Sequence, residues 1–324
     1  MPNDAKPRFA SLPDFILGCT RDIWEDRNIH RLHHYYAPDI VVRSPASVVI
    51  GNQNVIAATL STLAEWPDRT LPGEDVIWCG RADAGTLFSS HRLMCQATHT
   101  HPGAYGAPSG RTLTYRILAD CAVQDEQIYD EWLVRDQGAI VRQLGLDPKA
   151  FAAQQIEREG GADACIKPYS EKTDRAGRYL ERGNTHWAGT RFAQMLEALK
   201  NGGFQTLTTS YEEAAELHHP GHQTRVGPKG AENFWLPLFQ TVPNAALSID
   251  HTIGMEEAGR PTRAAVRWHL TGRHDGWGLF GPPTGAPLTI LGISHIEYGR
   301  SGIHREYTLI DECAIWKQIL LHTG

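Results

Sequence analysis

The sequence lacks the short motifs that bind nucleotides or position a serine nucleophile. No P-loop, G-x-G-x-x-G or G-x-S-x-G pattern occurs between a strand and a helix, where that chemistry would need it. The six cysteines are far apart and form no C-x-x-C pair. We therefore expect reduced thiols in the core instead of a disulfide framework.

Long hydrophobic runs and an excess of positive charge are missing too. No stretch approaches the roughly 18 apolar residues of a membrane span, and the opening "MPNDAKPRFASLPDF" has prolines and charges where a secretory signal has an apolar core. The net charge of −6 opposes binding to a polyanion such as nucleic acid. The expected protein is soluble and cytoplasmic, with neither a nucleic-acid nor a membrane partner.

The chain does contain one internal sequence repeat. Residues 92–144 match residues 267–319 at a constant offset of 175, with fourteen identities over 53 positions and no gap. A match of this length indicates a domain, because solenoid units repeat every 20 to 50 residues or so. With 324 residues, of which 41% are hydrophobic, each half can bury its own core. The sequence therefore predicts two copies of one domain in tandem.

Each copy is predicted to begin with three helices and to continue as a sheet. In the first copy, apolar residues recur at helical spacing up to Pro67, interrupted by a short hairpin, and the period changes to two from Val76 onward. We expect an α+β architecture in which a strongly curved sheet wraps the helices into a cone. The predicted boundaries are domain 1 at 1–150, a linker with room for a short helix at 151–186, and domain 2 at 187–324.

Both copies resemble the SnoaL-like polyketide cyclase family of the nuclear transport factor 2-like superfamily. The resemblance rests on "THTHPGAYGAPSGRTL" and "ADCAVQDEQIYDEWLVRD" in the first copy, and on "RWHLTGRHDGWGLFGPPTG" and "GISHIEYGRSGIHREYTLID" in the second. It implies a small-molecule substrate, a carbonyl compound, held in an apolar pocket without a cofactor or a metal ion. The reaction it implies is an aldol-type cyclisation, or a related lyase or isomerase reaction.

The same resemblance implies an acid/base carboxylate at Asp120, assisted by the imidazole of His99. Asp120 closes the apolar strand "YRILADCAV", where burial would favour the neutral acid and raise its pKa. A carboxyl tuned in this way can exchange a proton with a substrate carbon near neutral pH. In the second copy His295 stands where Asp120 stands, and His274 matches His99. The alternative is structural: Asp120 would satisfy backbone donors at a strand end, and His99 would be a packed or capping residue.

Further residues are expected to line the two pockets, mostly aromatic side chains that could clamp a flat ligand. For each of them the alternative is a place in the core or, for the two glutamates, a salt bridge. The candidates for substrate binding are Trp24, His101, Tyr105, Tyr115, Glu131, Trp268, Trp277, Phe280 and Glu306.

Two other functions stay open. A hydrolase or dehydratase would use the same pocket to activate water, and a tandem ligand-binding protein would have no turnover at all. Domains of this superfamily often pair through the outer face of the sheet, so the two copies are expected to form a pseudo-dimer within the chain. Pairing of two chains into a homodimer is a further option.

Overall fold

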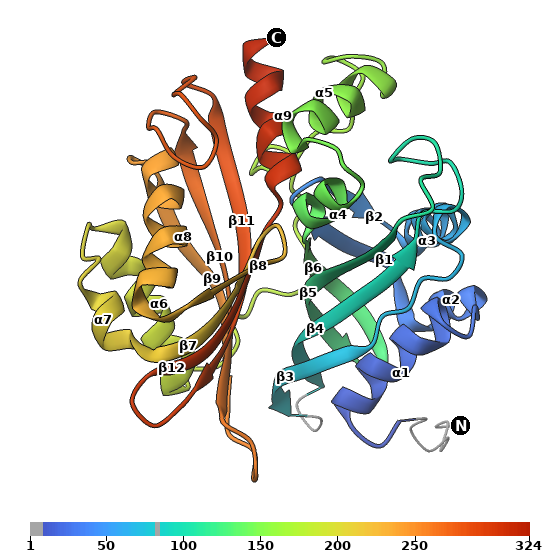
Figure 1. Ribbon diagram of the computed structural model, residues 1–324. Coiled ribbons are helices and arrows are strands. Elements are labelled where there is room, and N and C mark those ends of the chain that lie inside the picture. The colour runs from blue at the N-terminus through green and yellow to red at the C-terminus, as the bar shows by residue number, and fades with distance from the viewer. Residues whose placement is uncertain (1–8, 82–84) are drawn as a thin grey trace.

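The computed structural model describes residues 9–81 and 85–324, which form two repeated α+β units (Figure 1). In each unit, helices and a β-hairpin precede four further strands, and the hairpin joins these strands in one six-stranded sheet. The first unit contains α1 (Leu12–Trp24), η1 (Ile29–Arg31), α2 (Leu32–Tyr35), β1 (Tyr36–Ser44), β2 (Ser47–Ile50), α3 (Asn52–Glu65), β3 (Gly73–Arg81), β4 (Thr86–Thr98), β5 (Thr112–Gln124) and β6 (Gln127–Arg135).

The second unit repeats this order. It contains α6 (Trp187–Lys200), α7 (Thr206–Ser210), β7 (Tyr211–His219), β8 (Gln223–Val226), α8 (Gly227–Thr241), β9 (Ala246–Met255), β10 (Thr262–Arg273), β11 (Pro287–Tyr298) and β12 (Ile303–Ile310). Each unit is followed by a helix, α4 (Gln137–Gln143) after the first sheet and α9 (Glu312–Thr323) after the second.

The two sheets have the same topology. Their strand orders are β2-β1-β6-β5-β4-β3 and β8-β7-β12-β11-β10-β9. All neighbours are antiparallel except one pair in each sheet, β1 with β6 and β7 with β12, so both sheets are mixed. The sheets curl around their helices without closing, and the predicted cone is confirmed in this open form.

The helix that follows each sheet begins at a capping side chain. Asp136 and Asp311, matching positions of the repeat, cap α4 and α9: each carboxylate accepts a hydrogen bond from the backbone N–H three residues on, at 3.0 Å. Such a cap satisfies one of the free N–H groups at a helix start. The repeat therefore conserves the signal that ends the sheet and starts the following helix.

The two sheets pack against each other through their outer faces, with the first helices of each unit on the far sides (Figure 1). Side chains from β5, β6, β11 and β12 meet in one buried apolar cluster, which contains Leu118, Val134, Tyr169, Leu291, Ile293 and Leu309. The chain therefore forms the expected pseudo-dimer internally.

The predicted linker is not a loose connection. Helix α5 (Pro148–Arg158) starts before residue 151 and packs against α9 of the second unit. Lys317 on α9 donates to Glu159 at 2.6 Å, and Tyr169 lies in the cluster between the sheets. These contacts tie the segment between the two sheets to both of them.

Candidate functional site

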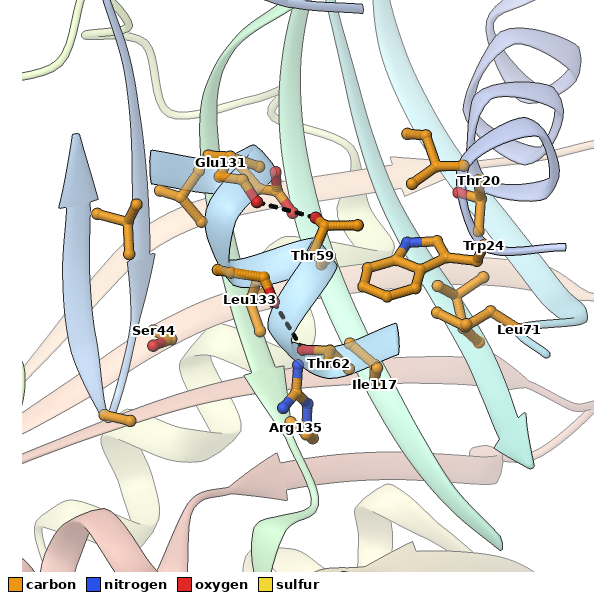
Figure 2. A pocket seen from close by; sticks show the side chains of 18 of the residues that line it. Thr20, Trp24, Ser44, Thr59, Thr62, Leu71, Ile117, Glu131, Leu133 and Arg135 are labelled. Atoms are coloured by element: carbon orange, nitrogen blue, oxygen red, sulfur yellow. Dashed lines mark hydrogen bonds between the residues drawn. The ribbon is translucent and has the colours of Figure 1, made fainter. Parts of the chain in front are cut away.

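A cavity of about 330 Å³ lies inside the first unit, between α1, α3 and the concave face of the sheet. Most of its wall is apolar, with Ile23, Leu71, Leu93, Ile117 and Leu133 among the lining residues. Figure 2 shows Trp24 entering from α1 and Thr59 and Thr62 from α3. The volume is at the lower end of the range for small-molecule pockets.

Strand β6 supplies two of the charged groups of this cavity, Glu131 and Arg135. Residues two apart on a strand share a face, and Glu131, Leu133 and Arg135 all line the cavity, one after another in Figure 2. Glu131 is buried, and burial raises its pKa to about 7, although a hydrogen bond with the Tyr36 side chain offsets part of the shift. Its carboxyl group can therefore take up or release a proton near neutral pH.

The second unit contributes to the entrance of the cavity. A second hollow of about 250 Å³ adjoins the first and shares Thr62, Arg135, Gln137 and Asp311 with it. Asp311, at the start of α9, thus lines a cavity of the first unit, and burial raises its pKa to about 7. Lys317 on the same helix lines the outer hollow. The site is built from both halves of the chain.

Asp120 does not face this cavity, so its expected position is wrong. Ala119 lines the cavity, and the neighbouring Asp120 points to the other face of the sheet, against the second unit. There it accepts hydrogen bonds from Arg267 at 3.0 Å and from Ser90 at 2.5 Å. Burial raises the pKa of Asp120, and the Arg267 guanidinium opposes that shift. Asp120 belongs to a buried ion pair between the sheets.

His99 cannot assist Asp120, because the two are far apart. Asp120 pairs with Ser90 across β4 and β5, and His99 lies nine residues further along, which corresponds to roughly 30 Å of extended strand. The His99 ring lies against Trp66, with ring centroids 4.9 Å apart, and its Nδ1 contacts Ser109 Oγ at 3.2 Å. The structural alternative therefore describes His99 as a packed residue, whereas Asp120 bonds to side chains and not to the backbone donors expected at a strand end.

His274 and His295 also lie outside any shared catalytic arrangement. His274 repeats the role of His99: its Nδ1 contacts Thr284 Oγ1 at 3.0 Å within the loop that precedes β11. His295 is fully buried between the sheets, where its Nε2 contacts Ser90 Oγ at 2.7 Å. Burial keeps the pKa of His295 well below its ordinary value. The expected two-imidazole pocket does not form.

The candidates for substrate binding in the first unit divide into three groups. Trp24 and Glu131 line the inner cavity, and Tyr105 and Tyr115 line the outer hollow. His101 is exposed and its Nδ1 contacts the adjacent Thr100 hydroxyl, away from both spaces. The aromatic candidates of the first unit thus line the inner cavity or the adjoining hollow.

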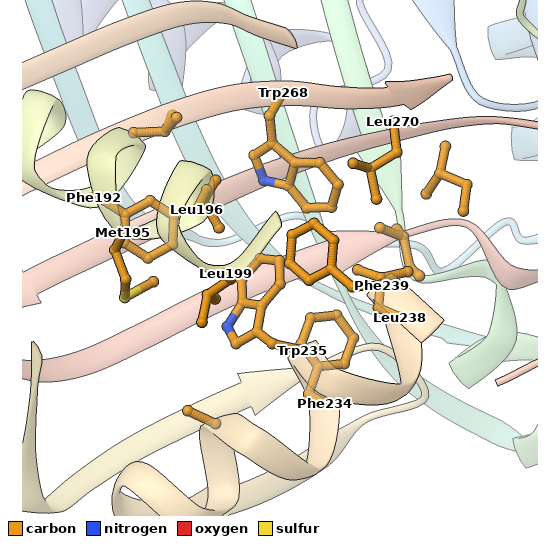
Figure 3. Packing of buried hydrophobic residues seen from close by; sticks show 14 of the residues in the cluster. Phe192, Met195, Leu196, Leu199, Phe234, Trp235, Leu238, Phe239, Trp268 and Leu270 are labelled. Atoms are coloured by element: carbon orange, nitrogen blue, oxygen red, sulfur yellow. The ribbon is translucent and has the colours of Figure 1, made fainter. Parts of the chain in front are cut away.

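In the second unit the corresponding space is filled by side chains. Figure 3 shows Phe234, Trp235 and Leu238 of α8 packed against Trp268 of β10. With the single inserted residue of the repeat, the α8 residues match Ala58, Thr59 and Thr62, which line the first cavity, and Trp268 matches Leu93. Positions that carry small side chains in helix α3 of the first copy therefore carry large ones in helix α8 of the second.

The other candidates of the second unit are structural. Phe280 is buried against Trp316 at 5.4 Å between ring centroids, whereas Trp277 is 64% exposed on a loop. Glu306 is fully buried and accepts hydrogen bonds from Tyr211 at 2.6 Å and from Thr308. Its carboxylate also lies 3.4 Å from His219. The expectation that these residues line a ligand pocket is wrong for the two buried ones.

Three charged cavity residues were not anticipated from the sequence: Arg69, Arg135 and Asp311. Arg135 could have been found, because it lies four residues after Glu131 on the same strand face. Arg69 follows α3 in a loop without periodicity, and Asp311 belongs to the other domain. No local pattern reports either of them.

Residues 9–81 and 85–324 contain neither a preformed metal site nor a membrane-spanning helix. Within that part of the chain, no group of three or more His, Cys, Asp or Glu side chains is arranged to hold a metal ion. No helix there is long and apolar enough to cross a bilayer.

Two family models match the chain, one in each unit. The model described as SnoaL-like polyketide cyclase matches residues 15–144, and the model described as SnoaL-like domain matches residues 192–305. None of the curated proteins compared with the chain matches it. The sequence expectation of two related domains is confirmed.

Solved structures also resemble parts of the chain. IdmH from Streptomyces antibioticus is 22% identical with a TM-score of 0.36, over 41% of this chain and 98% of its own. A SnoaL-like polyketide cyclase from Agrobacterium tumefaciens is 20% identical with a TM-score of 0.32, over 40% and 94%. TsrD from Streptomyces laurentii is 18% identical with a TM-score of 0.34, over 42% and 98%.

Proposed function

This chain carries two SnoaL-like domains in tandem, and on that premise we propose that its N-terminal domain transfers a proton on a small carbonyl compound. Glu131 is the acid/base group of this proposal. The observation that carries it is a buried carboxyl group on the wall of an apolar cavity of about 330 Å³. A carbonyl substrate fits the family description, because polyketides are chains of carbonyl groups.

The proposed step is simple in its chemistry. The Glu131 carboxylate takes a proton from a carbon next to the carbonyl group, and the electron pair of the broken C–H bond moves into an enolate. The enolate carbon then attacks a second carbonyl, or it is protonated again at another position. The proton held by Glu131 returns to the product oxygen or carbon, so the enzyme ends as it began.

The surroundings of Glu131 favour this role. Burial brings its pKa to about 7, close to the ambient pH at which general acid/base catalysts work best. Tyr36 interacts with the same carboxyl group and can donate its hydroxyl proton to an enolate oxygen. His91 stays neutral on the cavity wall, because burial lowers its pKa to about 4.

Hydrogen exchange tests the proposal without knowledge of the natural substrate. A panel of small 1,3-dicarbonyl compounds is incubated with the protein in D₂O, and exchange of the carbon-bound hydrogen is followed by NMR. We expect Glu131→Gln to slow catalysed exchange by about 10² to 10⁴, the usual contribution of a general base. The matched control is Glu306→Gln, which removes the same group from the second domain and should leave exchange unchanged.

Other outcomes separate the alternatives. Full exchange activity in Glu131→Gln would refute the role of this residue. Incorporation of oxygen from ¹⁸O-labelled water into a product would indicate a hydrolase or dehydratase in the same pocket. Binding of panel compounds without exchange or turnover would identify a ligand-binding protein.

A further inference from the structure

Two guanidinium groups line the N-terminal cavity without an acidic partner. Arg69 is 1% exposed, and its Nε contacts Cys95 Sγ at 3.1 Å. Its Nη1 is buried and has no hydrogen-bond partner among the described residues. The Nε of Arg135 is likewise buried without a hydrogen-bond partner among the described residues, although the side chain as a whole is half-buried and its charge acts on the nearby Asp311. Buried charges are normally paired, so both positions are unusual.

Other buried arginines of the chain show the normal pattern. Arg267 pairs with Asp120 at 3.0 Å, and Arg43 pairs with Asp130 at 2.9 Å. Arg69 instead lies over the ring of Trp24, 4.3 Å from its centroid. That contact supplies some stabilisation for a cation and leaves the in-plane donors on Nη1 without a hydrogen-bond partner among the described residues.

The two arginines lie around one part of the site. Arg69 and Arg135 both lower the pKa of Tyr115, which burial raises to about 12. Arg135 lines both the cavity and the outer hollow, where Tyr115 lies. Both positive charges therefore act on the same end of the cavity, next to the entrance.

The acidic groups of the cavity do not cancel this charge at mildly acidic pH. The carboxyl groups on its wall belong to Glu131 and Asp311, and burial raises the pKa of each to about 7. Glu65, in the outer hollow, is held by the backbone N–H of Tyr105 at 3.0 Å and lies 3.6 Å from His99. In the outer hollow, Glu159 is paired with Lys317 at 2.6 Å, so the positive charges left on the inner cavity wall below neutral pH are those of Arg69 and Arg135.

We propose that the ligand of this cavity carries a carboxylate, which binds the guanidinium of Arg135 beside Arg69 while its carbonyl-bearing part extends toward Glu131. This inference names a substrate class for the site and in that respect rests on the proposed function. Arginine is suited to the task, because its planar fork donates two parallel hydrogen bonds to a carboxylate.

Strand geometry sets the length of such a ligand. Glu131 and Arg135 are four residues apart on β6, in a stretch of regular pairing with β5, so their Cα atoms are separated by roughly 13 Å. The apolar wall between them includes Leu133. A compound with an acid at one end and a ketone several bonds away matches this spacing.

Pairs of acids and amides test the inference by binding alone. Benzoic, 2-naphthoic and decanoic acids are compared with their amides at pH 6 by calorimetry, where the free acids are ionised and Glu131 and Asp311 are mostly neutral. We expect at least one acid to bind wild-type protein about 10- to 100-fold more tightly than its amide, the range for a hydrogen bond between charged groups. Arg135→Met should remove this preference and Arg135→Lys should keep part of it.

Controls separate this result from folding defects and from the proposed function. Arg273→Met removes an exposed arginine of the second domain and should keep the preference, and so should Glu131→Gln. Equal affinity for acids and amides in wild-type protein, no binding of any acid at millimolar concentration, or an unchanged preference in folded Arg135→Met would each overturn the inference. A normal exchange rate in Glu131→Gln would refute the proton transfer and leave the acid preference standing.

Discussion

Glu131 and Glu306 occupy the same position of the repeat, yet their pKa values shift in opposite directions. Both are buried and both have a tyrosine nearby, Tyr36 in the first domain and Tyr211 in the second. Burial alone dominates at Glu131 and raises its pKa to about 7. At Glu306 burial acts in the same sense, but His219, Thr308 and Tyr211 together lower the pKa below its ordinary value. One glutamate is left with a transferable proton, and the other is fixed as a carboxylate.

The space around the two glutamates also differs: it is open around Glu131 and filled by side chains around Glu306. Thr59 and Leu93 of the first domain correspond to Trp235 and Trp268 of the second. Room for the second tryptophan comes from Gly292, which matches Ile117 and whose missing Cβ would collide with the Trp268 ring. The repeat thus preserves the fold while one copy keeps a cavity and the other becomes a solid core.

The second domain nevertheless takes part in the site of the first. Its helix α9 starts at the cavity entrance, and Asp311 and Lys317 line the entrance or the hollow outside it. The second domain has lost its own pocket, but it still forms part of the wall around the pocket of the first domain. The second domain therefore contributes to the site of the first even though its own core is filled.

Filling the first cavity should convert it into a copy of the second. We expect Thr59→Trp to abolish measurable binding of 2-naphthoate and catalysed hydrogen exchange, because the indole would occupy the space beside Glu131. Calorimetry and D₂O exchange check this. Ala64→Trp, at an exposed position of the same helix, should bind and react normally; a loss of binding there would show that the effect is not due to the cavity.

The reverse substitution tests the packed core. Trp235 is fully buried among aromatic rings, so Trp235→Thr should lower the free energy of unfolding by about 3 to 5 kcal/mol, as large-to-small core substitutions do. Denaturant titration measures the change. A change below about 1 kcal/mol would mean that this domain is as loosely packed as the first.

Asp120→Asn should affect stability and not chemistry. The substitution leaves the buried Arg267 without a charged partner, and breaking a buried pair in this way costs about 3 to 5 kcal/mol. The measured rate of exchange per folded molecule should stay that of wild type. A rate reduced more than about tenfold in the folded variant would restore Asp120 as a general base.

The pH dependence of stability should separate the two glutamates. Native Glu131 keeps its proton up to about pH 7, whereas the unfolded chain loses it near its ordinary value of 4.5. The folded state therefore binds more protons between these values, and the free energy of unfolding falls as pH rises through them, by roughly 3 kcal/mol. Glu131→Gln should abolish this loss.

Glu306 should show the opposite sign. Its carboxylate is stabilised in the folded state, so its contribution is present above the ordinary pKa and is lost as pH falls through the lowered one. Glu306→Gln should therefore flatten the acid side of the profile. The free energy of unfolding of both variants is measured from pH 3 to pH 8. Identical pH profiles of Glu131→Gln and Glu306→Gln would contradict the opposite pKa shifts of the two glutamates.

The fold could be predicted from the sequence because the repeat and the periodicity agree. The change from helical spacing to period two near Val76 lies close to the start of β3, and Asp136 and Asp311 mark the same helix start in both copies. These signals are local, and each copy confirms the other.

The site could be predicted only in part. Glu131 and Trp24 are on the cavity wall, but the carboxylate chosen for catalysis, Asp120, is on the opposite face. Strand β5 is buried on both sides, since the second domain covers its outer face. A strand of this kind is apolar throughout and gives no alternation from which the inward face could be read. Asp311 depends on the packing of the two domains, which no local pattern reports.

The most direct test of the account is the titration of the two glutamates themselves. With ¹³C-labelled glutamate, the side-chain carboxyl resonances of Glu131 and Glu306 can be assigned from their Gln variants and followed by NMR from pH 3 to pH 9. The account predicts that Glu131 titrates near pH 7 and that Glu306 titrates below its ordinary value. A Glu131 carboxyl that titrates at or below 4.5 would contradict the claim that the N-terminal cavity holds a transferable proton.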